Sequence, residues 1–221
     1  MAGPPEKDEI DLAAQQSVRD ARQRANPLDD DGLDLLFREA RSFNGWKDEP
    51  VSEGELKEIY DLAKMGPTSA NCCPLRIKFI TSPEAKEKFA PIMFERNRAK
   101  TRQAPAVAIF GMDHEFFHRQ PQLTPFRPDD IPNRMKENPG LIPHWASQNA
   151  TLQAAYFMMA VRAAGYDAGP MQGLDKEMCD DVFWAGTAVK TLFVCSIGRG
   201  DENTIFKRNP RLPFDDACEI L

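Results

Sequence analysis

A single stretch, ATLQAAYFMMAVRAAG at residues 150–165, restricts the fold of this chain more than any other part of it. Arg162 is its only charged residue, so the helix that it predicts is apolar on nearly every side. Such a helix is stable only where other protein surface covers it, either in a domain core or in a subunit interface. We therefore expect the rest of the domain to pack around a long, buried central helix.

Three further stretches are predicted to be β-strands, namely RIKFITS (76–82), APAVAIFGM (104–112) and KTLFVCSIG (190–198). The last two are mostly apolar, which indicates strands that are covered on both faces of a sheet. Cys195 lies within the third stretch and is expected to be an ordinary core residue. The pattern predicts an α+β fold, with a small sheet and helices around the central one.

Two helices are expected ahead of the first strand. Residues 32–43, GLDLLFREARSF, place apolar residues at helical spacing. In the second, at 50–66, Ser52 and Glu55 stand at the spacing of a capping box, which marks a helix start. Its apolar stripe should face the core and consists of Leu56, Ile59, Tyr60 and Ala63.

Residues 1–31 differ in composition from the rest of the chain, since they are polar, charged and interrupted by prolines. The middle of this stretch, IDLAAQQSVRDARQRA, is compatible with a helix. We expect residues 1–31 to be an N-terminal polar extension that is disordered or packs on a partner. Residues 32–221 are expected to form one domain with a core of its own.

Charge and composition argue against several classes of function. The formal net charge of −6 disfavours a nucleic-acid partner, because phosphate backbones need a positive surface. The chain shows neither the apolar run of a membrane span nor the basic start and apolar stretch of a signal peptide. Its five cysteines lack the spacing of a disulfide framework or of a zinc site, which favours a reducing, cytoplasmic compartment.

The motif HEFFH at residues 114–118 matches the H-E-x-x-H signature of zinc proteases, which needs two histidines on one face of a stable helix. Here a strand ends just before the motif and prolines follow it, which leaves at most about two turns of helix. The surrounding segment, 113–146, is proline-rich and irregular, as functional lids often are. A short lid helix whose Phe116 and Phe117 pack inward is therefore favoured over a zinc hydrolase.

Four short polar stretches stand out as candidates for binding: ARSFNGW (40–46), GPTSANCCP (66–74), AGPMQGLD (168–175) and FKRNPRLPF (206–214). The first and the last hold arginines, whose planar guanidinium groups suit phosphate. The second is a polar loop that can approach a planar ligand closely. The third keeps its backbone out of a helix, so that N–H groups can point outward. Each alone is also compatible with an ordinary solvated turn.

Together, these stretches resemble the flavin-dependent nitroreductase family. Typical members carry R-R-S-x-R near the start, P-S-S-x-N-x-Q-P after the second helix, P-[IM]-x-G-F-D after the central helix and a basic R-x-R-x-P turn near the end. Order and spacing agree from about residue 32 to the C-terminus. The resemblance implies a nitroreductase-like three-layer α+β fold with a small mixed or antiparallel sheet, and an obligate homodimer with FMN at its interface.

The resemblance also assigns cofactor-binding residues position by position. Arg41, Ser42 and Asn44 would bind the FMN phosphate and ribityl chain, together with Arg208 and Arg211 at the phosphate. Ser69 and Asn71 would reach the flavin from the other subunit. Pro170, Met171, Gln172 and Gly173 would lie over the flavin face, with a backbone N–H of Gln172 or Gly173 near N5.

The chain departs from the family pattern at three of these positions. Ala40 and Asn44 stand where many members have arginine, and Cys73 stands where glutamine is common. Fewer cations at the phosphate would weaken FMN retention unless Lys207 or Arg208 compensates.

Within the family, stretches such as MGPTSANCCPLRI and PRLPFDDACEIL resemble the malonic semialdehyde reductases of pyrimidine degradation, which reduce 3-oxopropanoate to 3-hydroxypropanoate with NAD(P)H. For such a small carboxylate aldehyde the lid should offer a cation. The candidates for substrate binding are His118, Arg119, Arg127 and Arg134.

The resemblance implies an enzyme without a catalytic side chain or a metal, because the flavin carries the redox chemistry. NAD(P)H would pass hydride to the flavin N5 and leave, and the second substrate would take its place in a ping-pong sequence. Two other readings remain open: a broad nitroaromatic or quinone reductase, and a non-catalytic flavin-binding protein on the same fold.

Overall fold

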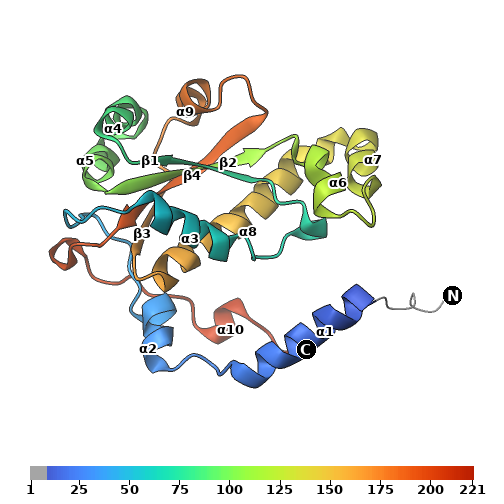
Figure 1. Cartoon of the computed structure of the whole chain (residues 1–221). Helices are drawn as coiled ribbons and strands as arrows, with labels where there is room; N and C mark the ends of the chain where they lie inside the picture. The colour runs from blue at the N-terminus through green and yellow to red at the C-terminus, as the bar shows by residue number, and fades with distance from the viewer. Residues whose placement is uncertain (1–8) are drawn as a thin grey trace. The chain divides into compact units, whose positions relative to one another are not determined.

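The protein is seen here in a computed structural model that describes residues 9–221, and the chain divides between Glu39 and Ala40 into two compact units (Figure 1). The first unit contains α1 (Glu9–Arg24), α2 (Asp30–Leu33) and the π-helical η1 (Asp34–Arg38). A helix is therefore present in the predicted extension, whose first eight residues lie outside the described part. The helix expected at 32–43 is shorter than predicted, because it ends at Arg38.

The second unit is built on a four-stranded antiparallel sheet with the order β1-β2-β4-β3. The three predicted strands are confirmed as β1 (Leu75–Ile80), β2 (Ala106–Asp113) and β4 (Val189–Gly198). The fourth strand, β3 (Asp167–Met171), corrects the expectation of a turn at 168–175. Its proline is tolerated because β3 lies at the edge of the sheet, where one missing N–H donor breaks no ladder.

Helices cover both faces of this sheet, which confirms the α+β fold in three layers (Figure 1). One face packs on α3 (Glu53–Ala63) and α8 (Ile142–Ala163), and Phe110 of β2 meets Phe157 of α8 edge-on at 5.5 Å. The other face packs on α4 (Pro83–Phe89), η3 (Ala90–Ile92), α5 (Glu95–Gln103) and α9 (Lys176–Phe183). Alternate side chains of β2 enter the two layers, so the strand is buried on both sides, as predicted.

The predicted capping box at the start of α3 is confirmed. The hydroxyl of Ser52 accepts a hydrogen bond from the Glu55 N–H, and the Glu55 carboxylate accepts one from the Ser52 N–H at 2.7 Å. Leu56, Ile59 and Ala63 are buried in the core, as expected. Tyr60 is not, because it lies at the margin of the apolar stripe and 48% of it is exposed.

The segment at 113–146 is not the irregular loop that its prolines predict. It contains η4 (Phe116–Arg119), α6 (Gln120–Leu123), α7 (Asp130–Glu137), η5 (Pro139–Leu141) and the first residues of α8, and we call residues 114–141 the lid. Pro121, Pro139 and Pro143 occupy first turns of helices, where a missing N–H costs no hydrogen bond. The prolines start helices here rather than interrupting them.

The central helix α8 therefore begins at Ile142, earlier than the predicted residue 150. Its sheet-facing side is buried, and Ala154, Phe157 and Val161 lie in the core. The opposite side is open in the single chain, since Leu152 and Tyr156 are 45% and 44% exposed. Although the sequence of α8 is apolar, no helix within residues 9–221 is long and apolar enough to cross a membrane.

Candidate functional site

Two segments far apart in the sequence form a cationic hollow of about 250 Å³. The first is the segment just before Gly45, and the second follows β4 and includes η6 (Glu202–Thr204) and the loop to Arg211. The hollow is lined by Ala40, Arg41, Ser42, Asn44, Arg162, Phe206, Lys207, Arg208, Asn209 and Arg211. It thus unites all five residues predicted for the phosphate end of the cofactor.

Hydrogen bonds to backbone carbonyls hold the arginines of this hollow in place. Arg41 donates from its guanidinium to the carbonyl of Phe206, and Arg208 donates to the carbonyl of Ala40 at 3.3 Å. Each segment therefore positions an arginine of the other. Because the Phe206 carbonyl is neutral, this contact does not neutralise the positive charge of Arg41.

A short antiparallel contact sets the register of the two segments. Trp46 forms a β-bridge with Gly200, and the Asp201 N–H donates to the carbonyl of Gly45 at 3.0 Å. Side chains pack so closely on both glycines that a Cβ on Gly200 would lie 2.2 Å from the ring of Phe43, and one on Gly45 would lie 2.5 Å from the Thr204 side chain. Only glycine fits at these two positions.

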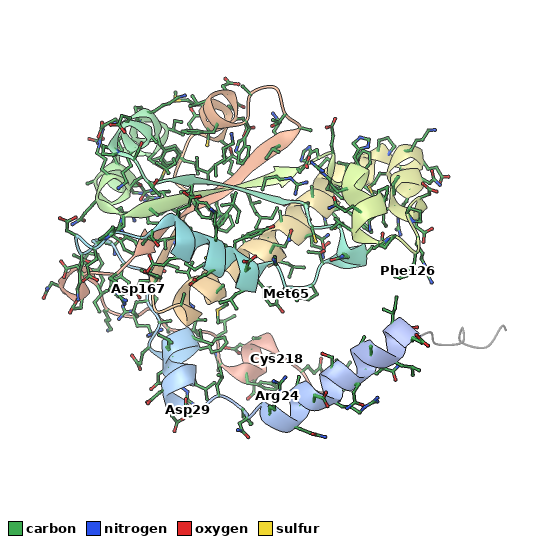
Figure 2. All side chains as sticks on the ribbon, in the orientation of Figure 1. Arg24, Asp29, Met65, Phe126, Asp167 and Cys218 are labelled. Atoms are coloured by element: carbon green, nitrogen blue, oxygen red, sulfur yellow. The ribbon has the colours of Figure 1, made fainter. Side chains whose placement is uncertain are left out.

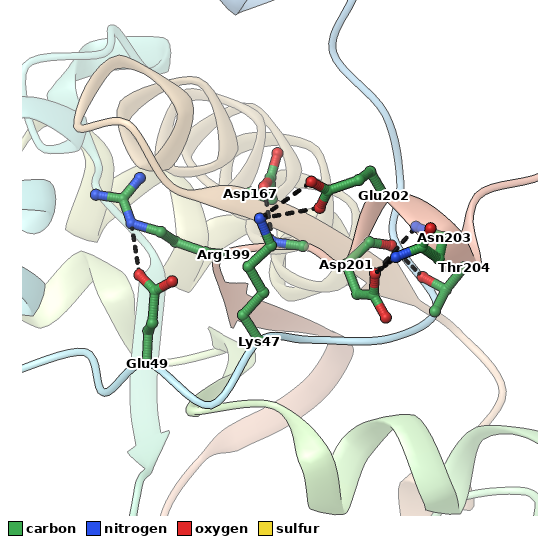
Figure 3. A network of polar contacts seen from close by, with 9 residues as sticks. Lys47, Glu49, Asp167, Arg199, Asp201, Glu202, Asn203 and Thr204 are labelled. Carbon is green, nitrogen blue, oxygen red and sulfur yellow. Dashed lines mark hydrogen bonds and ion pairs between the residues drawn. The ribbon is translucent and has the colours of Figure 1, made fainter.

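Ion pairs surround this contact on the outside (Figure 3). Lys47 pairs with Glu202 at 2.9 Å, and Arg199 pairs with Glu49 at 3.1 Å. Beside them, Asp167 at the start of β3 accepts a hydrogen bond from the Gly200 N–H at 2.8 Å, while its burial raises the pKa of the carboxyl. Exposed ion pairs of this kind each contribute little to stability, so the backbone contact determines the register of the two segments.

A second hollow of about 570 Å³, the β3 hollow, lies at the end of β3. It is lined by Asn44, Phe94, Arg96, Asn97, Lys100, Pro170, Met171, Gln172 and Gly173. The four residues predicted to lie over the flavin face are all in it, with Pro170 and Met171 at the end of the edge strand. Asn44 lines both hollows, so they adjoin, and we refer to the two together as the groove, which has a cationic end.

The contribution of α5 to this groove was not predicted from the sequence. Arg96, Asn97 and Lys100 all line the β3 hollow. Lys100 donates to the Asn44 Oδ1 at 3.2 Å, and its burial lowers the pKa of its ammonium group. Asn97 is buried and donates to the carbonyl of Gly173 at 3.1 Å. The only signal in the sequence is a run of cations in ERNRAKTRQ, which looks like a solvated helix face.

Arg162 was also missed, because it belongs to the apolar central helix. It stands in the last turn of α8 and lines the cationic hollow. A charged residue in an otherwise apolar helix was its only signal in the sequence.

Ser69 and Asn71 are not part of this groove within one chain. They lie in η2 (Ser69–Asn71), where the Ser69 N–H donates to Asn149 near the start of α8 at 2.7 Å. Asn71 donates to the carbonyl of Leu123 in the lid at 2.9 Å. Arg162, which lines the cationic hollow, stands 13 residues after Asn149 in α8, a rise of about 20 Å, so Ser69 lies far from the cationic end of the groove.

The lid residues predicted for substrate binding have different surroundings and do not converge. The ring of His118 lies 4.4 Å from that of Phe117, and the guanidinium of Arg134 lies 5.2 Å from the ring of Trp145. Arg119 lines a hollow beside α3 and β1, which Cys73 and Arg76 also line. Arg127 lines another hollow, between the loop at Ala70 and the lid.

HEFFH does not form the α-helix that an H-E-x-x-H metal site needs. His114 and Glu115 form a turn after β2, and only Phe116–Arg119 adopt a single 3-10 turn. Phe116 is fully buried and Phe117 packs partly against the same apolar cluster, as predicted for a lid helix. Within residues 9–221, no three His, Cys, Asp or Glu side chains are grouped so that they could hold a metal ion.

Comparison with known proteins agrees with this geometry. Residues 38–199 match the protein-family model described as "Nitroreductase family". A Leptothrix cholodnii protein, named "Putative NADH dehydrogenase/NAD(P)H nitroreductase", is 45% identical over 194 residues, which is 88% of this chain and 98% of that protein.

Solved structures share the fold. An Exiguobacterium sibiricum protein described as a "putative nitroreductase in complex with FMN" superimposes with a TM-score of 0.76 at 21% identity, over 89% of this chain and 100% of that one. A Staphylococcus epidermidis "putative NAD(P)H:FMN oxidoreductase" gives a TM-score of 0.73 at 22% identity, over 89% of this chain and 98% of that one.

Proposed function

The chain belongs to the nitroreductase family, and from this premise we propose that it is an FMN-dependent NAD(P)H oxidoreductase that reduces 3-oxopropanoate to 3-hydroxypropanoate. The observation that carries the proposal is the groove, whose cationic end holds Arg41, Arg208 and Arg211 and whose other end is formed by β3 and α5. The relatives named as nitroreductases and the FMN complex of a structural neighbour support it.

The residues of the groove fit FMN by their chemistry. The phosphate would lie in the cationic hollow, where arginines can donate paired hydrogen bonds to its oxygens. Ser42 and Asn209 add neutral polar groups there for the hydroxyls of a ribityl chain. The β3 hollow offers Met171 and Phe94 beside exposed backbone, which suits a planar ring. Arg162 and Lys207 supply the charge that Ala40 and Asn44 do not.

When bound, FMN supplies the two-electron transfer between NAD(P)H and the acceptor. This chain positions it and adjusts its electrostatics. Lys100, held against Asn44, would place positive charge by one end of the ring and favour its reduced, anionic form. A backbone N–H of Gln172 or Gly173 would donate a hydrogen bond at N5.

A complete site needs a second copy of the chain. Ser69 and Asn71 line neither hollow of the groove in one chain, so a second subunit would have to supply them. Exposed apolar side chains on α3 and α8 are available for such a contact: Tyr60, Leu62, Leu152 and Tyr156. We therefore include a homodimer with FMN at its interface in the proposal.

The finer assignments rest on the same resemblance. We propose pyrimidine degradation as the pathway and the cytoplasm as the compartment, the latter because all five cysteines are free. We propose residues 32–221 as the flavin-binding domain and residues 1–31 as an extension outside it. A broad nitroaromatic reductase is the second candidate, because the Leptothrix relative carries the name of a nitroreductase.

The test is oxidation of NADPH and of NADH by the FMN-loaded protein, with 3-oxopropanoate and a nitroaromatic as acceptors at matched concentrations. We expect a much larger kcat/KM for the aldehyde. Turnover with the nitroaromatic alone would replace the substrate assignment with the second candidate. FMN binding without turnover of either acceptor would leave a flavin-binding protein and overturn the enzymatic proposal.

A further inference from the structure

The hollow between η2 and the lid has no role in cofactor binding as proposed above. It measures about 350 Å³, and we call it the lid hollow. It is lined by Ala70, Gln120, Thr124, Phe126, Arg127, Asp130 and Ile131. Phe126 is 87% exposed at its rim, at the end of the unit opposite Asp167 of β3 (Figure 2). Ala70 stands between Ser69 and Asn71, so the lid hollow adjoins the loop that would reach the flavin of the second subunit.

Gln120, which lines this hollow, has a hydrogen-bond acceptor without a partner. The side chain is completely buried, and its Nε2 donates to the carbonyl of Ala70 at 2.6 Å and to the Thr124 hydroxyl at 2.7 Å. These two bonds orient the amide and leave its Oε1 without any partner in the described chain. A buried carbonyl oxygen without a donor is costly, so a ligand in the hollow that donates an O–H or N–H group to it would be stabilised.

Arg127 places a cation at the same hollow. Its backbone N–H donates to the carbonyl of Thr124 at 3.0 Å, which fixes the turn from which the side chain leaves. Among the ion pairs of residues 9–221, none involves Arg127, although Asp130 also lines the hollow. The guanidinium is therefore available to a carboxylate, with which it can form paired hydrogen bonds.

These two groups select one class of ligand. We propose that the lid hollow is the subsite that recognises short hydroxy acids and the oxo acids from which they form, with Arg127 binding the carboxylate and the Gln120 Oε1 accepting a hydrogen bond from the hydroxyl of the product. The assignment rests on the proposed function, because it names the substrate class of the same enzyme. It also separates Arg127 from the other lid cations, which have other surroundings.

The role of Arg127 is tested by replacing it with glutamine in the FMN-loaded protein. The substrates are 3-oxopropanoate and its methyl ester, which differ in the negative charge. We expect R127Q to lower kcat/KM for the acid by about tenfold or more, mainly through KM, and to leave the ester nearly unchanged. K136Q removes a charge from an exposed position on α7 and should behave like the wild type. An unchanged preference for the acid in R127Q would overturn the proposal.

The role of Gln120 is tested by binding rather than by turnover, since Q120L removes both donor and acceptor and can loosen the lid. Calorimetry on the FMN-loaded protein compares 3-hydroxypropanoate with propanoate, which lacks the hydroxyl. The wild type should bind the hydroxy acid several-fold more tightly, and Q120L should bind both alike. A general loosening of the lid would weaken the binding of both ligands equally and leave the ratio of their affinities unchanged. An unchanged ratio in Q120L would therefore contradict the role of Gln120.

The two proposals fail in distinguishable ways. A protein that does not bind FMN, or does not oxidise NAD(P)H with any acceptor, contradicts the proposed function itself. If the protein reduces the methyl ester or a nitroaromatic well, the proposed function stands. If R127Q then still prefers acids, only the lid subsite is contradicted.

Discussion

The guanidinium of Arg41 donates a hydrogen bond to the backbone carbonyl of Phe206, a residue 165 positions further along the chain. This bond joins the segment before the first core helix to the loop after the last strand, and the cationic hollow lies between them. Binding of an anion there therefore depends on tertiary structure as much as on the arginines themselves.

Replacing Arg41 with glutamine should weaken FMN binding by about tenfold or more, because a charge-assisted contact to phosphate is lost. Binding of riboflavin, which has no phosphate, should change much less. Fluorescence titration of the apoprotein with both flavins measures the two affinities. R102Q is the matched control, since Arg102 is exposed and pairs with Glu87 outside the groove. Equal losses for FMN and riboflavin would contradict a phosphate contact.

Adding a methyl group at Gly200 should disturb the site from a distance. In G200A the Cβ would overlap the ring of Phe43, which we expect to destabilise the fold by about 1–3 kcal/mol. FMN affinity should fall as well, because the register that brings Arg41 to Phe206 is altered. G140A is the control, since a Cβ at Gly140 meets nothing within 4 Å. Urea denaturation gives the stabilities, and wild-type stability of G200A would refute the close contact.

A charge on the open side of α8 should separate the proposed dimer. L152D places a carboxylate at a 45% exposed position, and M178D does the same at a 44% exposed position on α9. We expect light scattering to show monomers for L152D and dimers for M178D. FMN binding should be lost with the dimer, because Ser69 and Asn71 then no longer reach the groove. A monomeric L152D that binds FMN like the wild type would show that one chain suffices.

Acid should remove a stabilising contribution of Glu55. Hydrogen bonds from Ser52 and Tyr166 lower the pKa of this carboxyl to about 2 from its ordinary value of 4.5. Between these values the unfolded state binds more protons than the folded state, so stability falls as the pH falls. E55Q can still cap α3 but does not titrate. The difference in stability between wild type and E55Q should therefore shrink from pH 4.5 towards pH 2.

The control for this prediction is E58Q, the same substitution at an exposed position on α3. Urea denaturation of the three proteins at several acidic pH values gives the comparison. A difference between wild type and E55Q that stays constant over this range would show that the hydrogen bonds do not favour the ionised form.

Local features of the molecule were predictable because neighbouring residues determine them. The capping box needs only Ser52 and Glu55, and the buried strands can be recognised in the sequence as apolar runs. The same local reasoning failed where a residue is compatible with two different local structures. Pro170 indicated a turn but lies in an edge strand, and prolines such as Pro143 indicated a loop but begin helices. Which of the two structures forms depends on the residues that are neighbours in space.

Residue order alone predicted the α+β class and a long buried helix at the centre of the core, and the family resemblance added the three layers and about half of the residues that line the groove. That Lys100 and Arg162 line the groove became known from the fold, because a charge on a helix does not indicate in the sequence which surface it adjoins. The fold also decided that Ser69 lies far from the cationic end of the groove and that Gln120 has an acceptor without a partner. The physical reason is that periodicity reports which side of an element is buried, whereas a binding site depends on which elements meet and on which polar groups remain unsatisfied when they do.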